Sequence, residues 1–149
     1  MGVWSVLKGA VTGRAAAVPS ALLAAYPELG TIRWRRGGLP PRVGGWFLGH
    51  RTVAGITIGR TVWLAPDAPW NPGLLLHELR HAEQFGADRL FPLRYVWASL
   101  TRGYHRNPYE QDAVAFAGQR LRDGAYARMD PESPQQDGTS WSSTLPRRS

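Results

Sequence analysis

The pattern of apolar and polar positions is clearest in the middle of the chain, where β-branched and other apolar residues crowd together over residues 52–64. Such density is typical of β-strands. Gly59 and Arg60 interrupt the run at its centre, so the run predicts a β-hairpin or two short strands. A cluster of proline, asparagine and glycine over residues 65–73 then predicts a turn.

An amphipathic helix is predicted directly after this turn. Asn71 is a favourable N-cap, Pro72 suits the first helical position, and Gly86 marks the expected end. Apolar residues recur at helical spacing and form a stripe that we expect to face the core. The stripe consists of Leu75, Leu79 and Ala82.

Similar signals predict two further helices. The second begins near Pro92 and ends at Gly103, and the third takes Asn107 as its N-cap and extends to about Gly124. A strand pair followed by three helices predicts an α+β fold, with a short hairpin or small sheet and the helices beside it.

The ends of the chain differ from this central part. Short helices are expected over residues 3–12 and 19–26, within a basic N-terminal segment, residues 1–50, that packs on the domain. The central domain is expected over residues 51–128. Residues 129–149 are rich in proline, serine, glutamine and aspartate, and this composition predicts a disordered tail.

No apolar run is long enough to predict a transmembrane helix. The first residues are mildly apolar, but Arg14 and Pro19 interrupt them and no clear cleavage signal follows. We therefore expect a cytoplasmic protein, with secretion as the alternative.

Positive charge is concentrated in the first part of the chain. The formal net charge is +7, and residues 1–60 hold eight basic side chains against Glu28 alone, so the remainder of the chain is neutral in sum. The Arg-Trp-Arg-Arg run at residues 33–36 combines positive charge with an aromatic ring. This combination suggests an anionic partner, such as nucleic acid or an anionic surface, for the N-terminal segment.

The first predicted helix contains the sequence His77-Glu78-Leu79-Arg80-His81, an HExxH motif. Imidazoles four residues apart project from one face of a helix, where both can bind one Zn²⁺. Glu78 lies beside that face and can deprotonate a metal-bound water without being a ligand. The chain has no cysteine, which excludes disulfides, thiolate ligands and a cysteine nucleophile.

A catalytic zinc usually has a third protein ligand. The continuation of the motif that is typical of metzincins is absent. We therefore consider Glu110, in the first turn of the third helix, as the third ligand. It stands at the head of an apolar stripe formed with Val114, Ala117 and Leu121. Two alternatives remain. Glu110 is also the N3 residue after Asn107, where a capping-box glutamate would bind the N-cap N–H, and His105 in the preceding loop is a second candidate ligand.

Other polar residues near Glu110 have weaker assignments. Asp112 is a candidate to orient a ligand histidine through a hydrogen bond. Tyr104 or His105 could donate to the oxyanion that forms when water attacks a carbonyl. His50, the fourth histidine, is expected to be structural or exposed.

The segments AGITIGRTVWLAP, LLLHELRHAEQ and NPYEQDA together resemble small HExxH zincins of the gluzincin type. They are particularly similar to the compact metallopeptidase-like domain of contractile injection system proteins. The similarity covers about residues 54–117. It implies a minimal zincin-like fold, zinc ligands His77, His81 and Glu110, and Glu78 as base. It also implies that the strand at residues 61–64 lines the cleft and pairs with an extended peptide.

These observations favour a zinc-dependent metallopeptidase, in which a metal-bound water activated by Glu78 hydrolyses a bond of a peptide or protein substrate. The alternative is a catalytically inactive zinc-binding domain that serves as an interaction or cargo module, because a domain of this size leaves little protein for a second wall of a substrate cleft.

Overall fold

The computed structural model describes residues 12–41 and 54–129 and is an α+β fold, as predicted. Its sheet has four strands in the order β1-β2-β4-β3. The strands are β1 (Arg14–Ala15), β2 (Arg33–Arg36), β3 (Gly55–Ile58) and β4 (Thr61–Leu64). Pairing is antiparallel between β1 and β2, parallel between β2 and β4, and antiparallel between β4 and β3.

The predicted hairpin is confirmed as β3 and β4, joined by Gly59 and Arg60. Gly59 has a φ of 58°, which suits the first central position of a two-residue hairpin turn. β4 pairs on both sides, whereas β3 is an edge strand of the sheet that the structure describes. The expectation that residues 61–64 pair with a peptide is therefore wrong, because the backbone of β4 already pairs with β2 and β3.

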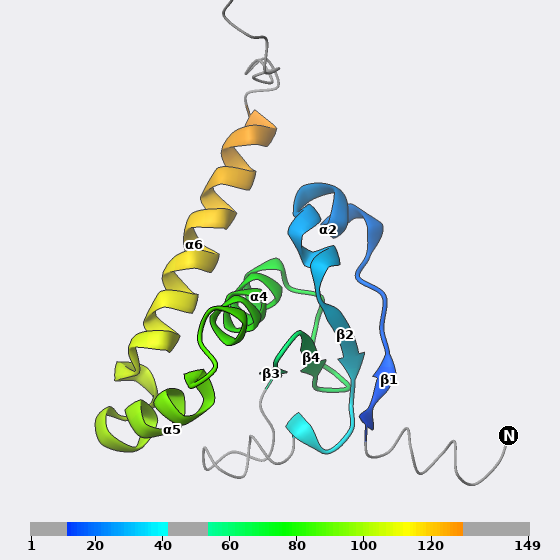
Figure 1. Cartoon of the computed structure of the whole chain (residues 1–149). Helices are drawn as coiled ribbons and strands as arrows, with labels where there is room; N and C mark the ends of the chain where they lie inside the picture. Colours follow the sequence, from blue (N-terminus) through cyan, green and yellow to red (C-terminus); the bar gives the residue numbers. More distant parts are fainter. Residues whose placement is uncertain (1–11, 42–53, 130–149) are drawn as a thin grey trace, which may run out of the picture.

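The helices follow the predicted order with small shifts at their ends. They are α2 (Ser20–Ala25), the 3₁₀ helix η1 (Pro27–Thr31), α4 (Pro72–Ala87), α5 (Phe91–Arg102), the 3₁₀ helix η2 (Tyr104–Arg106) and α6 (Pro108–Met129). α4 lies between the sheet and α6 (Figure 1). Among the described residues, no helix is both long and apolar enough to cross a membrane.

α4 forms where the sequence predicts it because its N-terminus is capped. The side chain of Asn71 accepts hydrogen bonds from the N–H groups of Gly73 and Leu74, at 2.8 and 3.2 Å. All three residues of the predicted stripe are buried. Around them the core contains Leu29, Trp34, Val62, Leu64 and Leu76.

The sequence did not predict β1 or β2, and β2 differs most from what was expected of its residues. Trp34 is buried and its indole N–H donates to the carbonyl of Leu29 at 2.8 Å. Arg35 donates to the carbonyl of Gly13, and Arg36 donates to that of Ala68. The aromatic ring expected to contact an anionic partner is thus in the core, and two of the three arginines bind backbone carbonyls.

Several expectations lie outside the described residues. These are residues 3–11 of the helix expected at 3–12, the role of His50, and residues 130–149 of the tail. The tail was expected from residue 129, but Met129 belongs to α6. The helix expected at residues 19–26 is confirmed as α2.

The contact between β1 and β2 gives a stability test with a matched control. Gly13 and Gly59 both have positive φ values, 68° and 58°, but only a Cβ at Gly13 would meet backbone oxygens, at 2.6 and 2.7 Å. We expect Gly59→Ala to cost about 1 kcal/mol of unfolding free energy and Gly13→Ala about 3 kcal/mol. Urea unfolding monitored by circular dichroism measures both losses of unfolding free energy. Equal losses in the two variants would contradict the close approach at Gly13.

Candidate metal centre

His77 and His81 lie one turn apart on α4, as the motif predicts. Their Nε2 atoms are 3.1 Å apart, and the rings meet edge to face. His81 is buried, whereas His77 is partly exposed to solvent. Both Nε2 atoms face α6.

Glu110 of α6 completes the group. Its carboxylate lies 3.3 Å from Nε2 of His77 and 3.1 Å from Nε2 of His81, and the residue is only 5% exposed. One ligand atom from each residue lies within 4.8 Å of the others. The two imidazoles and one carboxylate can hold a metal ion, and this donor set occurs in catalytic zinc sites.

The capping alternative for Glu110 is wrong, because the backbone N–H of Asn107 donates to the carbonyl of Tyr104 at 3.1 Å and not to the Glu110 carboxylate. The side-chain oxygen of Asn107 accepts from the N–H of Tyr109 at 3.0 Å. The side-chain amide nitrogen of Asn107 donates to the hydroxyl of Ser99 and to the carbonyl of Tyr95. Asn107 is fully buried, so its amide ties α5 to the start of α6. The Glu110 carboxylate is left to face the histidines.

His105 is also excluded from the donor group of the described residues. It lies in η2 and is exposed, with its ring against Tyr104. The apolar stripe assigned to α6 needs one correction, since Val114 is 62% exposed. The buried positions after Glu110 are Ala113 and Ala117.

Gln84 orients His81. The side-chain oxygen of Gln84 lies 2.8 Å from Nδ1 of His81, and its amide donates to the carbonyl of Tyr109 and to Asp112, at 3.1 and 2.8 Å. A proton on Nδ1 leaves Nε2 free to bind a metal. A direct hydrogen bond between Asp112 and a ligand histidine was expected. Instead, Asp112 contacts Gln84, and Gln84 contacts His81.

Asp112 also binds Arg80, which donates to both of its carboxylate oxygens. The Arg80 Nε donates to Asp112 at 2.7 Å, and another guanidinium nitrogen donates to Glu83 at 2.9 Å. Arg80 lowers the pKa of Asp112 through this hydrogen bond. Gln84 was not predicted from the sequence, although its spacing of three residues from His81 on one helix is a usable signal.

Tyr95 of α5 is a second residue that was not predicted. Its hydroxyl donates to Glu110 at 2.5 Å, and its ring meets that of His81 edge to face. Burial and the negative charge of Glu110 raise the pKa of Tyr95, so the hydroxyl keeps its proton. No sequence pattern indicates this role, because it depends on how α5 packs against α6.

Glu110 and His81 shift each other's pKa values. Burial by itself would raise the pKa of Glu110, but hydrogen bonds from His77 and His81 outweigh it, so the pKa lies well below its usual value. Burial would lower the pKa of His81, but the hydrogen bond to Glu110 and the charge of Glu78 raise it overall. A metal ion would therefore compete with a proton at His81.

Glu78 lies outside the donor group, on the side of α4 that faces β3. It is 5% exposed, and the hydroxyl of Thr57 donates to its carboxylate at 2.6 Å. Burial raises its pKa, and the nearby His81 and Thr57 partly offset that effect. The glycine at position 55 makes room for it, because a Cβ there would lie 2.7 Å from Oε1 of Glu78.

The Gln84 contact predicts a measurable effect on metal affinity. We expect Gln84→Ala to weaken Zn²⁺ binding about 10- to 100-fold, because His81 loses the partner that fixes its ring. Competition with a zinc-chelating dye measures the affinity. Gln119→Ala is the control, since Gln119 is an exposed glutamine of α6 that bonds Asp123. Wild-type affinity in Gln84→Ala would show that the contact does not orient the ligand.

Comparison with known proteins identifies no relative of this chain. No protein family model matches the chain, and no similar protein was found among curated proteins or solved structures.

Proposed function

We propose that this chain is a zinc-dependent metallopeptidase of the gluzincin type, as the resemblance of its motifs implies. The observation that carries the proposal is the convergence of His77 and His81 of α4 with Glu110 of α6, while Glu78 remains outside the donor set. Two imidazoles and one carboxylate leave a coordination position open on a tetrahedral zinc ion. A structural zinc site usually has four protein ligands.

Zinc bound by these three residues would polarise a substrate carbonyl and lower the pKa of water. Glu78 would take the proton of the attacking water and pass it to the leaving amine. Burial raises the pKa of Glu78, so its carboxylate binds a proton more strongly than an exposed glutamate does, as a general base requires. The Thr57 hydroxyl orients the carboxylate for this transfer.

Tyr104 is the candidate donor to the oxyanion. It is partly buried, and burial together with the charge of Glu110 raises its pKa, so its hydroxyl stays protonated. Its neighbour His105 is exposed and is the weaker candidate. A protonated hydroxyl can stabilise the negative oxygen that forms as water attacks the carbonyl.

The edge strand β3 is the candidate site for an extended peptide. The N–H of Ala65 donates to the carbonyl of Ala54 at 2.9 Å, and the β3–β4 register places Gly55 opposite Leu64. In an antiparallel pair, inward- and outward-facing backbone groups alternate. The N–H and C=O groups of Gly55 and Thr57 therefore face away from β4, where a peptide could add a strand beside Glu78.

A catalytically inactive zinc-binding interaction or cargo domain remains the second candidate. The observation that favours it is the burial of His81, Glu78 and Glu110, because closed sites are typical of structural zinc. The two candidates differ in whether Glu78 is needed for a reaction.

Metal content tests the donor set. We expect elemental analysis to find about one zinc per chain in the wild type, because the three proposed ligands form a site for one ion. His77→Ala and Glu110→Ala should lose or weaken binding, and the exposed His105→Ala should retain it. Zinc retained at wild-type affinity in Glu110→Ala would exclude Glu110 as a ligand.

The role of Glu78 is tested by Glu78→Gln. We expect this variant to retain zinc and to lose cleavage of a peptide library, because the amide cannot accept the proton of water. Glu83→Gln is the matched control, since Glu83 is an exposed glutamate on the same helix. Unchanged cleavage by Glu78→Gln would overturn the mechanism, and no cleavage by the zinc-loaded wild type would favour the interaction domain.

A further inference from the structure

The two faces of α5 have different surroundings. On the inner face, Phe91 and Ala98 are buried and Tyr95 binds Glu110. On the outer face, four large apolar side chains recur at positions i, i+3, i+4 and i+7 and are more than half exposed. They are Leu93 (70%), Val96 (54%), Trp97 (70%) and Leu100 (79%). We refer to these four residues as the α5 stripe.

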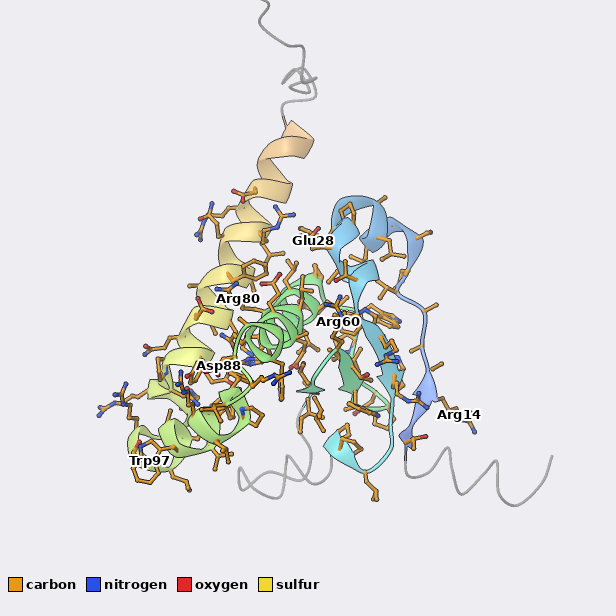
Figure 2. All side chains as sticks on the ribbon, in the orientation of Figure 1. Arg14, Glu28, Arg60, Arg80, Asp88 and Trp97 are labelled. Atoms are coloured by element: carbon orange, nitrogen blue, oxygen red, sulfur yellow. The ribbon has the colours of Figure 1, made fainter. Side chains whose placement is uncertain are left out.

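Single exposed apolar residues are common on protein surfaces, but a contiguous group of this kind marks an interaction site. Trp97 projects from the end of the molecule that α5 forms, away from the sheet (Figure 2). Leu90, just before the helix, is also 52% exposed and extends the apolar surface. The described residues therefore leave this face of the helix uncovered.

Positive charge lies beside the α5 stripe, because Arg94 and Arg102 line the same surface pocket as Leu93, Trp97 and Leu100. Residues 88–109 contain four arginines and one acidic residue, Asp88, which pairs with Arg94 at 2.8 Å. The other three arginines, Arg89, Arg102 and Arg106, are exposed and have no carboxylate partner among the described residues. The chain after residue 60 is neutral in sum, so this local excess is hidden in the total charge.

This charge discriminates among possible partners. A second copy of the chain would bring arginines close to arginines if the two stripes packed together, which is unfavourable. An anionic bilayer offers apolar chains for the stripe and negative headgroups for the arginines. Tryptophan also favours the boundary between headgroups and acyl chains, because its ring is apolar and its N–H is polar.

We propose that the outer face of α5 docks the protein on an anionic lipid bilayer. Trp97 and Leu100 insert at the boundary between headgroups and acyl chains, and Arg102 and Arg106 bind the anionic headgroups. The helix lies along the surface and does not cross it. Because the inner face of the same helix holds Tyr95 against Glu110, docking places the candidate metal centre close to the bilayer.

Vesicle flotation of the full-length protein tests the proposal. We expect the protein to bind vesicles of phosphatidylcholine mixed with phosphatidylserine, to bind pure phosphatidylcholine much less, and to dissociate at high salt. Combining Trp97→Ser with Leu100→Ser should weaken binding by about tenfold or more. Val114→Ser is the matched control, because Val114 is an apolar residue on α6 that is 62% exposed.

The arginines are tested in the same way. Combining Arg102→Gln with Arg106→Gln should weaken binding about fivefold for each charge removed, and Arg122→Gln on α6 should leave it unchanged. All substituted positions are exposed, so circular dichroism spectra should match the wild type.

Three results would overturn the proposal. The first is absence of binding to both vesicle types. The second is unchanged binding by the Trp97/Leu100 variant, which would assign lipid binding to another part of the chain. The third is a dimer that dissociates in this variant, or tight binding of an acidic helical peptide without lipid binding, either of which would assign the stripe to a protein partner.

Discussion

The contact on which the candidate site depends is the burial of the Glu110 carboxylate between two imidazoles. A buried carboxylate without partners is strongly destabilising. Here it is bound by His77 and His81 of α4 and by the Tyr95 hydroxyl of α5. Three helices thus meet at one charged group, and their relative positions are fixed by the need to satisfy it.

The same contact explains why α4 lies in the middle of the fold. Successive residues of a helix point about 100° apart, so His77 faces α6 while Glu78 faces β3. The metal donors of α4 and the candidate base therefore lie on adjacent faces of one helix, and Glu78, His81 and Glu110 are buried. Thr57 and the absence of a side chain at Gly55 adapt the strand to the carboxylate of Glu78.

The contacts of the arginines in the fold differ from those that their distribution along the sequence suggests. Arg35 and Arg36 bind backbone carbonyls and hold β2 and the turns beside it, so they support the sheet. The exposed arginines near α5 belong to a part of the chain whose total charge is zero. The placement of each arginine relative to carbonyls, carboxylates and apolar surface decides its role.

Local signals in the sequence determined much of the structure. The Asn71 cap, the hairpin at Gly59 and Arg60, and the spacing of His77 and His81 depend on neighbouring residues, so the sequence predicted them. Contacts between distant segments were decided only by tertiary structure. The pairing of β2 with β4 buries Trp34, and the packing of α5 on α6 brings Tyr95 to Glu110. No local pattern encodes such contacts, because each depends on how separate elements pack together.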